Sequence, residues 1–269
     1  MFKHIVFSNL WIALGAVCLT LNFYLLNNLS INTNVLLFVF FATLFSYNFQ
    51  RLIKIKFKIN LKGERVDWIK LNKTGIYFIT IIALIGSVVY GLPLIEKTWK
   101  LLLLIGLLTF FYVWKIPGFK GKSLRDIPTL KIFIIALVWV LFCVVFPTWL
   151  ADVDINNLIV YSGSVFLLMI AITIPFDVRD MNLDAQTKKT IPQLIGERKA
   201  AYLSVVLFLL SQVGLIYLYP QHKLGLLIFM LIGSWILIKS KNKNKELYFS
   251  GIVDGLLVLQ SLLIYLLTS

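Results

Sequence analysis

Long apolar runs separated by short polar segments dominate the pattern of this 269-residue chain. A helix needs about 20 mostly apolar residues to cross a bilayer, and nine runs approach or reach that length. An asparagine-rich segment between the first two runs, residues 27–34, indicates a short polar turn. The pattern predicts an all-α fold, a single transmembrane domain over residues 1–269 that is a bundle of nine helices. The predicted spans are 7–27, 34–52, 74–93, 98–115, 131–149, 157–177, 200–219, 223–239 and 248–267.

Composition places the chain in the membrane. Hydrophobic residues make up 59% of the sequence, and the mean hydropathy is +0.89. A soluble domain could not bury so much apolar surface, so the class is a polytopic membrane protein. The first apolar run leads straight into the second without a small-residue cleavage site, so we expect no cleavable signal. Cys18 and Cys143 lie inside apolar runs, where we expect packing residues without a disulfide or a metal.

The basic residues are distributed unevenly between the two sides of the predicted bundle. The net charge is +14, yet only Lys97, Lys100 and Lys223 among the 26 bases fall on one side. The positive-inside rule then places the N-terminus in the cytoplasm and, after nine spans, the C-terminus outside. The excess is a topology signal, helped by anionic lipid and a phosphorylated substrate, and does not indicate a nucleic-acid partner. We expect an integral protein of the bacterial inner (cell) membrane.

Three carboxylates end the sixth apolar run, at Asp177, Asp180 and Asp184. Offsets of three and seven place all three on one face of a helix, where like charges repel and require a cation. Mg²⁺ prefers one or two carboxylates together with waters and substrate phosphates, and Lys188 and Lys189 follow within reach of such a phosphate. The alternative is a solvated helix end whose acids offset neighbouring bases.

This stretch resembles the second aspartate motif of the UbiA-type intramembrane prenyltransferases. In that family an Asp-x-x-x-Asp core, often preceded by one more Asp, ends a transmembrane helix. A basic residue, Ser or Thr, and a short apolar run to Leu-Gly or Ile-Gly follow. The matching residues here are Asp177, Asp180 and Asp184, then Lys189–Thr190 and Leu194–Ile195–Gly196.

A second segment also resembles the family. The family has Tyr-x-x-Lys after the fourth span, then a basic loop and a proline before the fifth, and Tyr112, Lys115 and Pro128 match these positions. Gly118 and Gly121 in this loop would permit close backbone approach to a phosphate, although a basic cytoplasmic turn explains the loop equally well.

The first aspartate motif of the family is degenerate in this chain. Asn48 aligns with the Asn of Asn-Asp-x-x-Asp-x-x-x-Asp, but the three Asp positions hold Phe49, Leu52 and Lys56. Two interpretations remain open. Arg51 and the nearby lysines contact phosphate oxygens directly as charge-assisted donors, or they only mark the cytoplasmic end of the helix.

The resemblance implies a helical bundle around a central cavity that opens to the cytoplasmic side, and a transferase. Such an enzyme binds an isoprenyl diphosphate with Mg²⁺, ionises its C–O bond, and lets a lipid-soluble acceptor, a quinone precursor or similar, capture the allylic cation. By this resemblance the catalytic and metal-binding residues are Asp177, Asp180 and Asp184. The substrate-binding residues would be Asn48, Arg51, Tyr112, Lys115, Lys188 and Lys189.

Two other functions are alternatives to prenyl transfer. Loss of the first-motif acids favours a catalytically altered or inactive relative that binds or carries isoprenoid lipid, whereas the retained second motif argues against it. Asp254, one or two turns inside the ninth span, motivates an ion-coupled transporter, although most charges lie at helix ends. Asp254 either pairs with a base such as Arg179 or Lys131, or contacts substrate. Residues 59–72 fit either a short interfacial helix, which over a site could act as a lid, or a plain surface loop.

Overall fold

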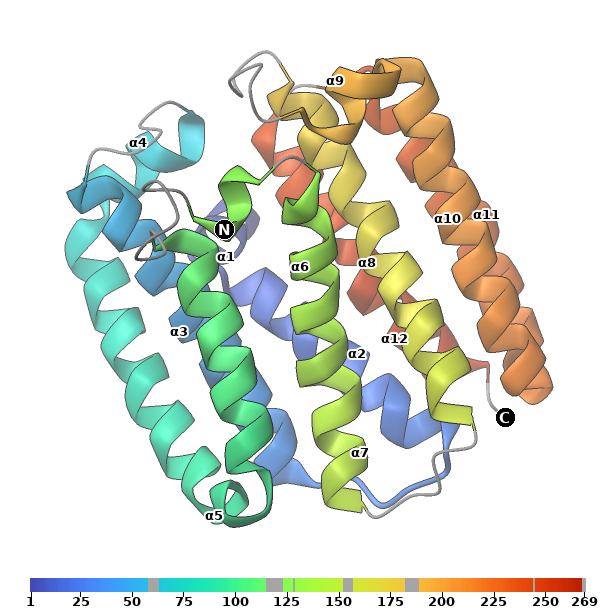
Figure 1. Ribbon diagram of the computed structural model, residues 1–269, viewed down its shortest axis with the longest axis horizontal. Coiled ribbons are helices and arrows are strands. Elements are labelled where there is room, and N and C mark those ends of the chain that lie inside the picture. Colours follow the sequence, from blue (N-terminus) through green and yellow to red (C-terminus); the bar gives the residue numbers. More distant parts are fainter. Residues whose placement is uncertain are drawn as a thin grey trace.

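The computed structural model describes residues 1–57, 63–114, 123–127, 129–151, 157–181, 189–243 and 245–267. Within these ranges the regular elements are helices and no strand occurs (Figure 1). Seven helices of the described chain are long and apolar enough to cross a membrane, and α2 (Leu10–Leu26) is a shorter apolar helix. The seven are α3 (Thr33–Lys56), α5 (Lys73–Val113), α6 to α7 (Leu130–Ala151), α8 (Leu158–Asp180), α10 (Glu197–Leu218), η5 with α11 (Pro220–Ser240) and η6 with α12 (Tyr248–Leu266). The all-α prediction is confirmed for these residues.

Helix α5 contains two of the predicted spans. Its 41 residues would extend about 60 Å if straight, twice the hydrocarbon thickness of a bilayer. Figure 1 shows that α5 runs down one side of the bundle and doubles back at the lower end. Pro93 lies inside the helix, where its missing N–H and its ring permit a bend. The connection between the predicted spans 74–93 and 98–115 is therefore helical, and the number of nine separate helices stays a prediction.

The helices pack in chain order into a closed ring. Each of α2, α3, α5, α6, α8, α10, α11 and α12 contacts the next, and α12 contacts α2 to close the ring. Helix α2 also touches the π-helical segment η2 (Leu141–Val145), which joins α6 (Leu130–Val140) to α7 (Phe146–Ala151). Aromatic side chains fill this interior: Phe23, Phe38 and Phe146 belong to the main apolar cluster.

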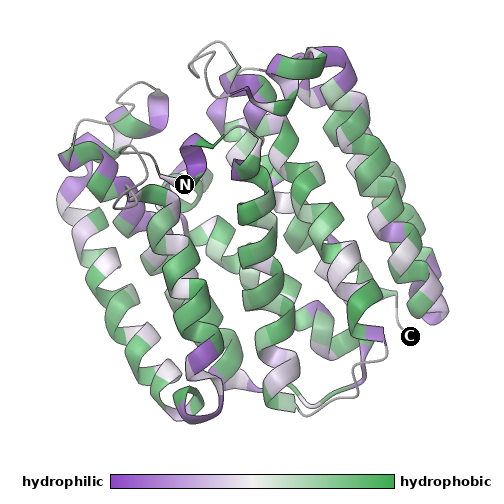
Figure 2. Ribbon diagram, viewed as in Figure 1, coloured by the Kyte–Doolittle hydropathy of each residue, from purple (hydrophilic) through white to green (hydrophobic). Residues whose placement is uncertain are grey.

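Side-chain exposure supports an integral membrane protein. On α10, Tyr202, Val206 and Leu210 are exposed, while Ser204 and Ser211 are buried. Apolar residues outside and small polar residues between helices are what a lipid environment requires. Figure 2 shows hydrophobic colour along the lengths of the helices, with hydrophilic residues gathered at the upper end around α4 and α9.

The first predicted span is broken near its start. Helix α1 (Phe2–Phe7) ends before Asn9, which adopts a left-handed conformation with φ 67°, and α2 begins at Leu10. Helix ends leave carbonyls without partners. Arg65, from the short helix α4 (Glu64–Leu71), donates to the carbonyl oxygens of Val6 at 2.9 Å and Phe7 at 3.3 Å. Of the two alternatives for this segment, the structure has a short helix at Glu64–Leu71, and Arg65 attaches it to the break.

Arg65 is almost completely buried, at 5% exposure. Its guanidinium also donates to Ser250 Oγ at 3.3 Å, and its backbone N–H donates to Glu246 Oε2 at 3.2 Å. Burial lowers the pKa of Arg65 to about 9, and the charge of Arg51 adds to that shift, so the side chain stays cationic at neutral pH. Helix α4 is thus held by a buried cation rather than resting freely on the surface.

We predict that Arg65→Gln destabilises the protein by about 2–4 kcal/mol, because carbonyls at the end of α1 lose a charged donor. Thermal unfolding in detergent measures the effect. The control Lys70→Gln, on the same helix, removes only an exposed ion pair with Asp67 at 3.5 Å and should stay within about 0.5 kcal/mol. Equal stability of the two variants would contradict the role given to Arg65.

Candidate functional site

A cluster of charged residues gathers where α3, α4, α8 and the start of the last span meet. Its guanidinium and carboxylate groups are close enough to act on one another electrostatically. Three cations face three anions, so the cluster is neutral as a whole when every group is ionised. We call it the charged cluster; its members are Arg51, Arg65, Arg179, Asp180, Glu246 and Asp254.

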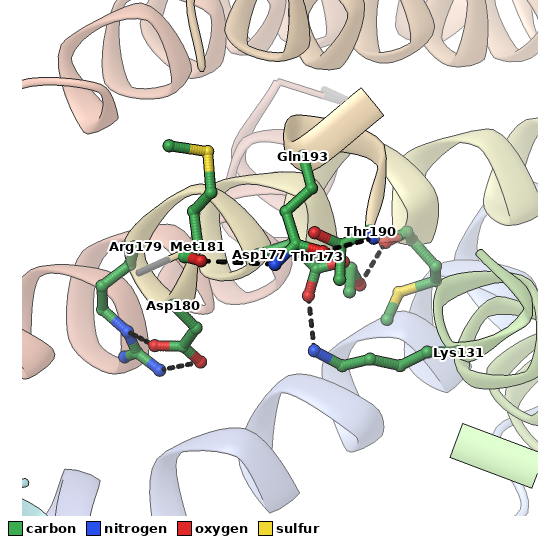
Figure 3. Close-up of polar contacts among 9 residues, drawn as sticks. Lys131, Thr173, Asp177, Arg179, Asp180, Met181, Thr190 and Gln193 are labelled. Atoms are coloured by element: carbon green, nitrogen blue, oxygen red, sulfur yellow. Dashed lines mark hydrogen bonds and ion pairs between the residues drawn. The ribbon is translucent and has the colours of Figure 1, made fainter. Parts of the chain in front are cut away.

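Asp177 lies beside this cluster and is paired with a base from another helix. Its side chain is 3% exposed, and Lys131 of α6 donates to its Oδ1 (Figure 3). A carboxylate near the C-terminus of a helix faces the negative end of the helix dipole, which makes a nearby cation more necessary. Lys131 therefore neutralises Asp177, and is not the partner of Asp254.

Asp180 ends α8 and is paired with its neighbour in sequence. Arg179 donates from Nε to Oδ1 at 2.7 Å and from Nη2 to Oδ2 at 3.0 Å, a two-point contact (Figure 3). The Arg179 guanidinium lies over the rings of Phe176 and Phe249, 5.3 and 5.2 Å from their centroids. Its Nη1 is buried and, within the described part of the chain, has no acceptor. That N–H group can donate to an additional anion.

The segment after the acidic stretch folds back onto the end of α8. Gln193 of α9 (Ile191–Ile195) donates to the Met181 carbonyl at 3.3 Å and accepts from the Thr190 N–H at 3.0 Å (Figure 3). Gly196 follows with φ 86°, a conformation that glycine adopts readily, and α10 begins at the next residue. Thr190 and Gly196 therefore have structural roles in this fold-back.

Only part of the predicted acidic site lies within the described structure. Asp177 and Asp180 stand on α8 as predicted, and exposed Lys189 follows with φ 44°. Asp184, Lys188 and Lys115 lie outside the described residues. The shared helical face of all three acids therefore stays a prediction.

Arg51 and Asn48 occupy different environments on α3. The Arg51 guanidinium has charged neighbours in the cluster but, among the described residues, no hydrogen-bonded one. Asn48 is fully buried; it accepts from Asn9 Nδ2 at 2.7 Å and donates to the Ser8 carbonyl at 3.0 Å. The Asn48 amide thus stabilises the break between α1 and α2. The guanidinium N–H groups of Arg51 can donate to an additional acceptor.

The degenerate first motif lies on another face of α3. Phe49 is 43% exposed and stacks on Phe45, and Leu52 packs with Ile69 and Ile76. Tyr47, one turn before Arg51, is on the face of the charged cluster and is an electrostatic neighbour of Tyr112. The positions aligned with the family's aspartates therefore face away from the acids of α8, whereas Tyr47 and Arg51 face toward them.

Sequence reasoning did not select Arg65, Glu246 or Tyr47. Each lies far along the chain from the acidic stretch, and no local pattern links them to it. Asp254 was selected through its depth in an apolar span, and it does join the cluster, with Arg65 and Arg179 as charged neighbours.

The described side chains suit Mg²⁺ only in part. Among the described residues no three His, Cys, Asp or Glu side chains gather at one point. Asp177 and Asp180 supply carboxylate oxygens, and the remaining ligands of Mg²⁺ are usually water and substrate phosphate. The donor set fits an ion that arrives with a phosphate, provided that Lys131 and Arg179 release the two carboxylates.

Two hollows of the described structure, of about 430 and 400 Å³, lie between α10 and α11 and do not include members of the charged cluster. The predicted central cavity open to the cytoplasm stays a prediction.

Comparison with known proteins shows the fold. A UbiA homologue from Archaeoglobus fulgidus bound to GPP and Mg²⁺ has a TM-score of 0.60 at 15% identity, covering 100% of this chain and 98% of that one. Another structure of a UbiA homologue from the same organism gives 0.57 at 17% identity, with 99% of each chain covered. A structure described for digeranylgeranylglyceryl phosphate synthase in membranes gives 0.55 at 16% identity, covering 100% and 98%. No family model and no curated protein sequence matches.

We predict that Lys131→Met destabilises the protein by about 2–4 kcal/mol, because it leaves the buried Asp177 carboxylate without its cation. Thermal unfolding in detergent measures the change. The double variant Lys131→Met/Asp177→Leu should recover at least half of the loss, since no unpaired charge remains. A double variant less stable than Lys131→Met alone would show that the pair is not the source of the effect.

Proposed function

We propose that this chain, which has the fold of the UbiA homologues, is an intramembrane prenyltransferase. It moves an isoprenyl group from an isoprenyl diphosphate to a lipid-soluble acceptor, a quinone precursor or similar, with Mg²⁺. One observation carries the proposal: α8 ends in Asp177 and Asp180 beside the Arg51 guanidinium and the Arg179 Nη1 group, for which the described residues provide no hydrogen-bond acceptor. Carboxylates for a metal and free donors for phosphate oxygens stand together at the polar end of an apolar bundle.

The diphosphate is held by charge-assisted donors. Arg51 and the Nη1 group of Arg179 are the described donors. Lys189, which follows the acidic stretch in sequence, is a further candidate. Arginine presents its N–H groups in a fixed fork that matches phosphate oxygens. The first motif of the family is absent, and Arg51 takes over part of its role by direct contact.

Asp177 and Asp180, with Asp184, would hold Mg²⁺, which supplies positive charge for the departing diphosphate. Lys131 and Arg179 occupy the two described carboxylates in the structure. When the substrate arrives, both cations can turn from carboxylate to phosphate. Diphosphate and Mg²⁺ should therefore bind together, each increasing the affinity for the other.

A second candidate function has support from the same contacts. Lys131 and Arg179 already neutralise Asp177 and Asp180 without a metal. This favours a catalytically altered relative that binds or carries isoprenoid lipid. The two functions differ in whether Mg²⁺ is required and whether the C–O bond breaks.

We further propose that the polar end of the bundle faces the cytoplasm. The charged cluster and the bases of α4 and of the start of α10 lie at this end, while the turn of α5 that carries Lys97 lies at the other (Figures 1 and 2). The asymmetry supports the orientation derived from the positive-inside rule.

Transfer is tested with purified protein, radiolabelled geranyl, farnesyl or geranylgeranyl diphosphate, and an extract of membrane lipids and quinone precursors as acceptor. We predict label in a lipid product only with Mg²⁺, and a loss of at least 100-fold in Asp180→Asn, because a ligand to the metal is removed. Asp67→Asn, an exposed carboxylate on α4, is the control and should keep full activity. Transfer that continues in EDTA would contradict the metal role.

The role of Arg51 has its own test. Arg51→Gln should raise the KM for isoprenyl diphosphate about 10- to 100-fold, because a charge-assisted contact to phosphate is lost. Lys56→Gln, on the face of α3 that carries Phe49 and Leu52, should change KM less than twofold. Phe49→Asp should not raise activity, since Phe49 points away from the charged cluster. A gain in Phe49→Asp would mean that this face of α3 reaches the substrate.

A further inference from the structure

Two hollows lie along the pair formed by α10 and α11, away from the proposed transferase site. The first, of about 430 Å³, is polar and is called here the polar pocket; it is lined by Glu197, Arg198, Tyr202, Lys241 and Asn242. The second, of about 400 Å³, is called here the apolar groove; it is lined by Leu209, Leu227, Met230, Leu231 and Ser234.

The two hollows lie on one face of the helix pair. Tyr202 and Leu209 of α10 are seven residues apart, and so are Lys241 and Ser234 at the end of α11. Seven residues are nearly two full turns of an α-helix, so these positions share a face and lie about 10 Å apart along the axis. The helices pack closely behind them, where a Cβ on Gly233 would meet the ring of Phe208 at 2.2 Å. The polar pocket and the apolar groove therefore follow one another along the same face of the helix pair.

The positions of the two hollows along the helix axes match the headgroup and acyl regions of one leaflet of a bilayer. The polar pocket is at the helix ends, where α10 begins and α11 finishes. The groove extends about 10–20 Å farther along the axis, and half of a hydrocarbon core is about 15 Å. Tyr202 is 57% exposed and Trp235 is 63% exposed, as expected for aromatic residues on a lipid-facing surface near the interface.

The chemistry of the polar pocket combines two bases with one acid. Arg198 and Lys241 offer cationic donors, and Lys241 Nζ lies 5.6 Å from the centroid of the Tyr202 ring. Asn242 adds an amide, and Glu197 offers a carboxylate acceptor. A phosphate suits the two bases, while Glu197 suits a neighbouring hydroxyl or ammonium donor on the same ligand.

We propose that α10 and α11 bind a phospholipid in this site. Its phosphate contacts Arg198 and Lys241, the hydroxyl or ammonium of its headgroup donates to Glu197, and one acyl chain lies in the apolar groove. Glycerol and ethanolamine headgroups carry such a donor, and choline does not. The site requires no prenyl transfer, so it is independent of the proposed function.

The test uses delipidated full-length protein with added phosphatidylglycerol, phosphatidylethanolamine or phosphatidylcholine, each dioleoyl. Native mass spectrometry counts bound lipid, and thermal unfolding measures stabilisation. The first two lipids should give one-to-one adducts and raise the unfolding temperature by about 5 °C. Phosphatidylcholine should give less than half of either effect. Equal effects of all three lipids would overturn the part assigned to Glu197.

Two sets of variants test the contacts to the headgroup and to the acyl chain separately. Arg198→Gln/Lys241→Gln should lower the lipid adduct at least tenfold. Its matched control, Lys199→Gln/Lys245→Gln, removes equal charge at the same end outside the pocket and should keep the adduct. Leu231→Trp adds bulk to a side chain that lines the groove and should lower the adduct as well, whereas Leu224→Trp, also exposed on α11 but outside the groove, should not.

Three results would overturn the proposal. Unchanged adducts in both test variants would mean that lipid binds elsewhere. Equal stabilisation by glycerol phosphate or inorganic phosphate would mean an anion site without an acyl chain. A dimer that Leu231→Trp dissociates would mean that the groove receives a second copy of the chain.

Discussion

Neutralisation of carboxylates at the polar end of an apolar bundle is the constraint on which the rest of the site depends. Asp177 is nearly enclosed, and both it and Asp180 lie at the negative end of the α8 dipole. An unpaired charge there would be very costly, so a cation must accompany each acid. Lys131 comes from a neighbouring helix and Arg179 from α8 itself. The proposed chemistry follows from this pairing.

The same pairing relates the two candidate functions. A protein that never bound metal would keep these ion pairs permanently. A transferase would exchange them when Mg²⁺ and diphosphate enter, because both cations prefer a phosphate no less than a carboxylate. Among the described residues, Arg51 forms no hydrogen bond to a carboxylate and one Arg179 N–H group has no acceptor, so both can donate to an incoming anion.

Local sequence was sufficient to predict the helices and the acids of α8, because both depend on patterns of contiguous residues. It was insufficient where a contact joins distant parts of the chain. The break at Asn9 became visible only with Arg65, 56 residues later, and the role of Asn48 depends on that break. The sequence also could not show that Phe49 and Leu52, at positions aligned with the first aspartate motif, share a face of α3 that turns away from α8. Which face of a helix turns toward a neighbouring helix depends on packing, whereas the presence of the helix can be predicted from local sequence.

The most direct measurement is equilibrium binding of a non-hydrolysable isoprenyl diphosphate analogue to the detergent-purified protein, in Mg²⁺ and in EDTA. Mg²⁺ should strengthen binding at least tenfold, and the double variant Asp180→Ala/Asp177→Ala should bind equally with and without the metal. Binding of equal strength in EDTA would assign the diphosphate to the arginines alone and remove the acids from the mechanism. No binding in either condition would contradict a diphosphate site in this protein.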